Sequence, residues 1–227
     1  MTKPPAPEEA ASTRDDLGRI SWMAWLLIVG SACFAIGPLV TVMDASVTLV
    51  SVVFFVGSLF FTSASTIQLL LAKETLTPGG VLQRLFHWRN GAWSSAAIQW
   101  LGTLAFNVTT FRSVVDALGT KDLTANAVWT PDAVGSVLFL VSSAIACMPE
   151  VRRHRHGHVR DRSWLIAALN MLGSIFFGLS AIGAYTIPKT GELVNQVWSN
   201  GGTFLGALGF LIGAWLLLPA RTHTHPR

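Results

Sequence analysis

The feature that most limits how this chain can fold is a glycine followed four residues later by phenylalanine, inside each of six apolar stretches. The six pairs are Gly30/Phe34, Gly57/Phe61, Gly102/Phe106, Gly135/Phe139, Gly173/Phe177 and Gly206/Phe210. The residue one after each glycine is small, as is the residue seven after it. These positions share one face of an α-helix, and small residues on such a face let membrane helices approach closely. The pattern predicts helices that pack through this face.

The apolar stretches are long enough to span a membrane. Hydrophobic residues make up 51% of the chain and charged residues 12%, and the mean hydropathy is +0.50. The stretches cover residues 20–42, 47–72, 93–114, 133–148, 164–187 and 202–218. Most are close to the about 20 residues that a transmembrane helix needs. We therefore predict an all-α integral membrane protein with six transmembrane helices, the fourth extended at its start by residues 129–132.

Basic residues predict how the helices are oriented. Most of them fall in the segments that would share one side of the membrane with the amino terminus, which places both termini in the cytoplasm by the positive-inside rule. We expect a plasma membrane, in a bacterium, as the location. The positive charge lies in short segments beside the membrane, so it does not indicate nucleic-acid binding.

The chain divides into three helical hairpins and the segments that flank them. The hairpins are residues 20–72, 93–148 and 163–218, entering the membrane from the same side as tandem parallel repeats. The flanking segments are a disordered cytoplasmic tail (1–19), a connector with a surface helix (73–92), a basic His/Arg-rich loop (149–162) and a second tail (219–227). Three such hairpins could pack around an axis along the membrane normal, as a ring, or as a slab.

The hairpin resembles the YrhK-like family of small membrane domains. The residues that carry this resemblance are Leu172, Gly173, Ser174, Phe177, Leu205, Gly206 and Phe210. Ala207 stands where the family pattern has serine, and the other two hairpins fit with Thr103 or Ser136. The resemblance implies a helical membrane hairpin of uncharacterised biochemistry, and it brings no catalytic residues.

Few residues in the predicted helices could carry chemistry. We interpret Asp44 and Asp132 as caps near the starts of their helices, and Arg112 as reaching the membrane surface. The six histidines fall in predicted loops or the tail, and Cys33 and Cys147 form no metal-binding motif. We expect no enzyme, metal or cofactor. The basic loop is a candidate site for anionic lipid.

Three carboxamides inside the predicted helices are candidate lining residues for a cavity. They are Gln99, Asn107 and Asn170. Carboxamides are costly in lipid unless they form hydrogen bonds, so these should face the bundle interior. There they would either join helices through hydrogen bonds, which we favour, or line a polar cavity.

A third candidate site lies in the two longer outer loops, which match in sequence around residues 120–129 and 190–198. Asp122 and Glu192 would accept a cationic ligand, and Trp129 and Trp198 would form its walls. Three functions are therefore open. The first, which we favour, is a helical scaffold or accessory subunit that binds another copy or a membrane partner. The others are a channel or facilitator for a small neutral polar solute and an outer recognition site.

Overall fold

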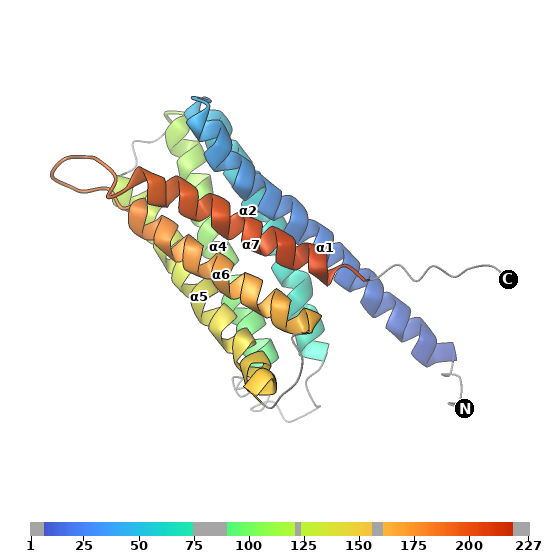
Figure 1. The fold of residues 1–227 in the computed structure, drawn as a ribbon. Helices are drawn as coiled ribbons and strands as arrows, with labels where there is room; N and C mark the ends of the chain where they lie inside the picture. Colours follow the sequence, from blue (N-terminus) through green and yellow to red (C-terminus); the bar gives the residue numbers. More distant parts are fainter. Residues whose placement is uncertain (1–6, 75–89, 121–123, 156–160, 220–227) are drawn as a thin grey trace, which may run out of the picture.

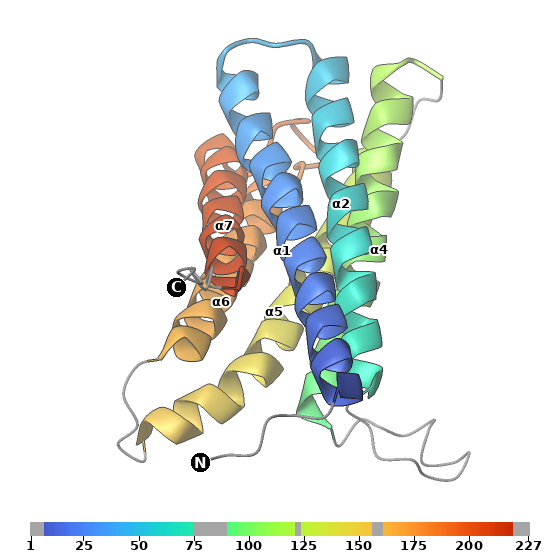
Figure 2. The same ribbon diagram turned by 90° about the vertical axis from the view of Figure 1, so that its right-hand side faces the viewer.

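The computed structural model describes residues 7–74, 90–120, 124–155 and 161–219. The described part contains six α-helices and no β-strand. The helices are α1 (Pro7–Val42), α2 (Val47–Glu74), α4 (Gly91–Ala117), α5 (Ala125–Arg155), α6 (Arg162–Gly183) and α7 (Gln196–Leu217). They run up and down, so the α1–α2, α4–α5 and α6–α7 connections lie at the same end of the bundle (Figures 1 and 2).

The helices close into a ring. Each packs mainly against the helices before and after it, and α7 packs against α1. The bundle is therefore a ring rather than a slab, because a slab would leave its first and last helices, α1 and α7, without a contact between them.

Five of the described helices are long and apolar enough to cross a membrane: α1, α2, α5, α6 and α7. Helix α4 has a comparable length of 27 residues but falls outside this group. Its apolar stretch is interrupted by Gln99 and Asn107 and by hydroxyl residues. Most of these hydroxyl residues are buried, such as Ser95, Thr103 and Thr110. The polarity of α4 is therefore directed into the bundle.

Two helix boundaries differ from the sequence prediction. Helix α1 begins at Pro7, so residues 7–19 are helical rather than a disordered tail, as their glutamates and alanines allow. Helix α5 begins at Ala125, earlier than the apolar stretch suggested, and it continues through Pro131 and Pro149 to Arg155. The surface helix predicted near residues 81–88 and most of the His/Arg-rich loop lie outside the described residues.

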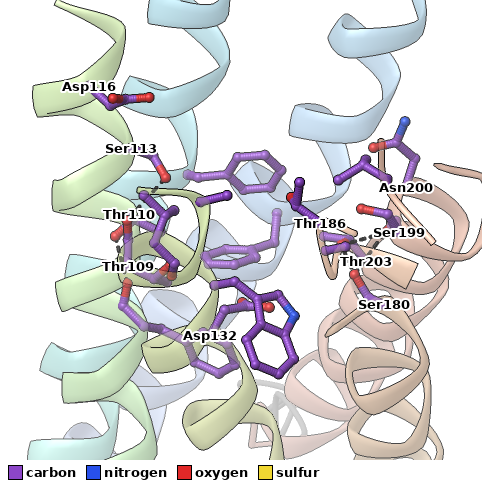
Figure 3. Close-up of a pocket in the computed structure, with 18 residues that line it drawn as sticks. Thr109, Thr110, Ser113, Asp116, Asp132, Ser180, Thr186, Ser199, Asn200 and Thr203 are labelled. Atoms are coloured by element: carbon purple, nitrogen blue, oxygen red, sulfur yellow. Dashed lines mark hydrogen bonds between the residues drawn. The ribbon is translucent and has the colours of Figure 1, made fainter. Parts of the chain in front are cut away.

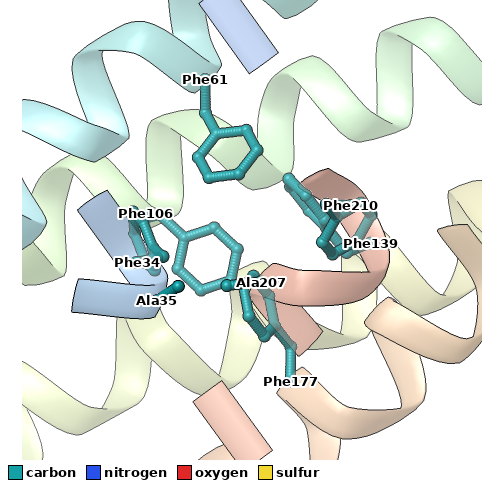
Figure 4. Close-up of a cluster of buried hydrophobic side chains, with 8 residues drawn as sticks. All are labelled: Phe34, Ala35, Phe61, Phe106, Phe139, Phe177, Ala207 and Phe210. Atoms are coloured by element: carbon teal, nitrogen blue, oxygen red, sulfur yellow. The ribbon is translucent and has the colours of Figure 1, made fainter. Parts of the chain in front are cut away.

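The six phenylalanines of the repeated motif form the centre of the bundle. All six are buried in one cluster with Ala35 and Ala207 (Figure 4). The rings of Phe34, Phe106 and Phe177 lie 5.9–6.3 Å apart by their centroids. The rings of Phe61, Phe139 and Phe210 lie 5.6–6.4 Å apart. Helices from all three predicted hairpins therefore contribute equally to one aromatic core.

Within each helix pair, the glycine of one helix lies against the phenylalanine of the other. A Cβ atom on Gly102 would stand 2.7 Å from the Phe139 ring, and one on Gly135 would stand 3.2 Å from the Phe106 ring. The same reciprocal contact joins α1 to α2 and α6 to α7. The glycines are thus required because each leaves room for a partner's ring.

Hydroxyl groups join neighbouring pairs of helices. The Oγ atom of Ser65 lies 3.1 Å from Oγ1 of Thr103, between α2 and α4. The Oγ atoms of Ser143 and Ser174 lie 2.8 Å apart, between α5 and α6. Ser31, which follows its glycine as Thr103 and Ser174 do, has a buried Oγ without a hydrogen-bond partner in the described structure. The interface between α1 and α7 therefore differs from the other two.

Candidate functional site

A cavity of about 390 Å³ lies at the end of the bundle that carries the α4–α5 and α6–α7 connections. Its lining comes from all six helices and from residues 184–193. Seven of the lining residues carry hydroxyl groups: Thr109, Thr110, Ser113, Ser180, Thr186, Ser199 and Thr203. Figure 3 shows them on facing walls, with Asp116 and Asn200 toward one end and Asp132 deeper. No Lys, Arg or His is found among the described lining residues.

The floor of the cavity is the aromatic core. Phe34 and Phe106 line the cavity, and together with Phe177 they also line a smaller space of about 20 Å³ next to it. Asp132, Ser180 and Thr203 line both spaces. The carboxylate of Asp132 therefore stands where the hydroxyl-lined chamber meets the phenylalanine rings.

Asp132 does not cap its helix. It lies two turns after the start of α5, too far along to accept the free amides of the first turn. It forms no hydrogen bond or ion pair with any described residue. Asp44 is no cap either, because Ser46 accepts the Leu49 amide at the start of α2 while Asp44 has a φ of 57° in the preceding turn. Both cap predictions are corrected.

Several hydroxyl groups of the cavity donate their hydrogen to a backbone carbonyl. Thr109 donates to the carbonyl of Val128. Ser113 donates to that of Thr109 at 3.0 Å, and Ser180 donates to that of Ser199 at 2.7 Å. A hydroxyl that donates to the backbone still has lone pairs to offer. The wall therefore presents hydrogen-bond acceptors to the cavity.

Among the described members of the predicted outer-loop site, Trp129 alone lines the cavity. Its Nε1 donates to the Ala181 carbonyl at 2.8 Å, and its ring meets Tyr185 edge-on with centroids 4.9 Å apart. These contacts fix the indole between α5 and α6. Its predicted partner Trp198 is 50% exposed, and neither Trp198 nor Glu192 is among the lining residues. Asp122 lies outside the described residues.

The predicted cavity-lining carboxamides lie at helix contacts instead. Gln99 Oε1 accepts from Ser142 at 3.4 Å, between α4 and α5. Asn107 Nδ2 donates to Thr62 Oγ1 at 2.8 Å, between α2 and α4. Asn170 Oδ1 lies next to Gly213, between α6 and α7. None of the three carboxamides lines the cavity, so the cavity-lining alternative is corrected. The interhelical hydrogen bonds of Gln99 and Asn107 agree with the interpretation favoured from the sequence. The Nδ2 of Asn107 is bonded at its interface, but its Oδ1 is buried without a hydrogen-bond partner among the described residues.

Arg112 has a partner that the sequence did not indicate. Its guanidinium donates to the Ala127 carbonyl, and its side chain is half-buried between α4 and α5. It thereby ties the start of α5 to α4. No group of three or more His, Cys, Asp or Glu side chains in the described residues is placed to hold a metal ion.

The repeated glycine motif could have indicated two of the hydroxyl residues that line the cavity. Thr109 and Ser180 both stand seven residues after a motif glycine, a position that the sequence suggested for packing only. In the structure, Thr109 and Ser180 line the cavity, so the helix face that the sequence assigned to packing also contributes hydroxyl groups to the cavity wall. Asp132 was missed because Pro131 and the preceding polar residues suggested a helix start, where a carboxylate is common.

No protein-family model, curated protein or solved structure matches this chain. The fold and the cavity therefore define only a class: a helical integral membrane protein with a hydroxyl-lined cavity at one end of the bundle.

Proposed function

We propose that this is a non-enzymatic membrane protein that binds a small polar solute in the cavity at the end of the bundle. The cavity itself is the observation that carries the proposal. Its volume of about 390 Å³ falls in the range of about 300–1,000 Å³ that is usual for small-molecule sites. No described lining residue is a histidine or lysine that could act as the base for a hydroxyl nucleophile, which favours binding over catalysis.

A channel or facilitator for a small neutral polar solute is the alternative from the sequence. It is less well supported, because Phe34, Phe106 and Phe177 lie beneath the cavity with centroids 5.9–6.3 Å apart. A solute would have to displace rings that are packed in the core to move beyond them.

A scaffold or accessory-subunit role is a second candidate. The carboxamide and hydroxyl contacts between helices favour it, since they hold the bundle together without needing a solute. The partner of such a scaffold would be a second copy of this chain or another membrane protein. The bilayer lipid would surround the bundle, and anionic lipid would bind at the basic loop.

We further propose that the bundle consists of three tandem copies of a YrhK-like hairpin around a pseudo-threefold axis, with both termini cytoplasmic, in the plasma membrane. The reciprocal glycine–phenylalanine contacts in each helix pair support the repeat. The two triangles of phenylalanine rings support the axis.

Filling the cavity tests the binding proposal. Ala184→Phe places a ring in the cavity wall, whereas Val197→Phe alters an exposed position outside it. Purified full-length protein in nanodiscs would be titrated with ammonium, polyol and carboxylate solutes while its melting temperature is followed. We expect at least one solute to raise the melting temperature saturably in the wild type and in Val197→Phe, but not in Ala184→Phe. If no solute class does so, or if Ala184→Phe responds like the wild type, the proposal is contradicted.

A further inference from the structure

The cavity has an electrostatic character that limits its ligand further. Its described lining contains two carboxylates and no basic side chain. Asp132 is the informative one, because it lies within a helix that is apolar enough to span a membrane. A carboxylate within such a helix is costly unless a cation or hydrogen-bond donors compensate it.

No described residue supplies that compensation to Asp132. The two hydroxyl residues that line both cavity spaces with it, Ser180 and Thr203, are already engaged elsewhere. Their oxygens lie 2.6 Å apart, and both lie within hydrogen-bond distance of the Ser199 carbonyl. Thr110 likewise donates to the Phe106 carbonyl at 2.7 Å. Next to Asp132, a ligand therefore meets hydroxyl groups whose hydrogens are already donated elsewhere, and it has to bring the donors for the carboxylate itself.

The rest of the wall is aromatic. Trp129 is held in place by its bond to the Ala181 carbonyl, and Phe34, Phe54 and Phe106 also line the cavity. Indole and phenyl rings attract cations and pack against hydrocarbon. The described residues offer no group of three carboxylate, histidine or cysteine side chains of the kind that holds a divalent metal ion.

We propose that the ligand of this cavity is a small organic ammonium ion with N–H donors. Its charged nitrogen pairs with Asp132, its N–H groups meet the hydroxyl oxygens, and its carbon chain lies against the aromatic wall. This inference rests on the proposed binding function, and it adds the charge and the donor character of the solute.

The test compares ammonium and neutral compounds of equal size on the same protein. Full-length protein in nanodiscs would be titrated with ethanolammonium, with ethylene glycol as the neutral match, and with sodium and potassium chloride. Asp132→Asn removes the charge and keeps the shape. Asp44→Asn is the matched control, because Asp44 is exposed, lies outside the cavity and has a φ of 57° that asparagine tolerates.

We expect ethanolammonium to bind the wild type and Asp44→Asn alike, and Asp132→Asn to bind it on the order of tenfold more weakly. Ethylene glycol should bind weakly to all three. If ethylene glycol binds the wild type as well as ethanolammonium does, the cavity binds solutes but the ammonium inference is wrong. If sodium or potassium alone gives the same response, the organic part of the inference is wrong. If Asp132→Asn does not fold, the comparison of ethanolammonium with ethylene glycol on the wild type tests the ammonium inference.

Discussion

Gly206 of α7 lies directly against the ring of Phe177 in α6, so that a Cβ atom on this glycine would stand 2.4 Å from ring atom Cδ1. The contact is reciprocal, because a Cβ on Gly173 would stand 3.0 Å from the Phe210 ring. The two glycines also face each other's backbone, with each Cβ position 2.9 Å from the other's carbonyl oxygen. The two helices therefore approach so closely that only glycine, whose side chain is a hydrogen atom, fits at these positions.

Adding one methyl group at this contact should destabilise the bundle. We expect Gly206→Ala to cost about 1–3 kcal/mol, because the buried ring and the backbone opposite cannot both move away. Gly178→Ala is the matched control in α6, since nothing lies within 4 Å of its Cβ position. It should leave stability unchanged or raise it by up to about 1 kcal/mol through helix propensity. Thermal unfolding in detergent measures both, and equal melting temperatures for the two variants would contradict the prediction.

Two serines at equivalent sequence positions should respond in opposite ways to alanine. Ser174 bonds the Ser143 hydroxyl at 2.8 Å, so Ser174→Ala should cost about 0.6–2 kcal/mol. Ser31 has no partner for its buried Oγ in the described structure, so Ser31→Ala should be neutral or stabilising. The melting temperatures of the two single variants are the measurement. A loss at Ser31 as large as that at Ser174 would show that Ser31 is bonded after all.

The missing partner of Ser31 can be supplied. Ser65 and Ser143 stand eight residues after their glycines and bond the residue that follows a glycine in the next helix pair. Ala214 holds this position in α7 and is buried. We expect Ala214→Ser to raise stability by about 0.5–1.5 kcal/mol through a bond to Ser31. In the Ser31→Ala background the same substitution should lose that gain, which a double-mutant cycle measures. A gain that persists without Ser31 would contradict the pairing.

The aromatic core should be sensitive to the loss of any ring. Phe139 is 1% exposed and touches the rings of Phe61, Phe106, Phe177 and Phe210. Phe139→Ala should cost about 3–5 kcal/mol, because the packed rings cannot fill the space. Phe111 is 54% exposed on α4, so Phe111→Ala should cost much less. Unfolding of the two variants by denaturant or heat gives the comparison, and a similar loss for both would argue against a tightly packed centre.

The start of α6 should weaken at acid pH. Asp161 accepts from the Trp164 amide at 3.0 Å, which lowers the pKa of its carboxyl, and Arg153 at 2.9 Å lowers it further. The ionised form is thus favoured in the folded protein, so its stabilising effect is present above about pH 4 and is lost as the pH falls through the lowered pKa.

The matched variant for this effect is Asp161→Asn, which keeps a capping oxygen but has no charge. Its melting temperature should lie below that of the wild type at neutral pH and converge with it as the pH falls below about 4. A difference that stays constant across this range would mean that the charge of Asp161 is not involved.

The sequence by itself determined the helical membrane class and predicted that each helix packs through its glycine face. Hydropathy and a spacing of four residues are local properties, and Gly102 or Phe106 shows them without reference to any other segment. The boundaries of α1 and α5 were not determined in this way, because Pro7 and Pro131 are compatible with either a helix or the end of one.

Only the tertiary structure decided which faces meet. Gln99 and Asn107 were candidates for a cavity, yet each bonds a hydroxyl on a neighbouring helix, whereas Asp132, Thr109 and Ser180 meet around an open space. A single helix pattern cannot distinguish an inward face that touches a neighbour from one that faces a cavity. The difference depends on how six helices close into a ring, and closure is set by side chains far apart in the chain.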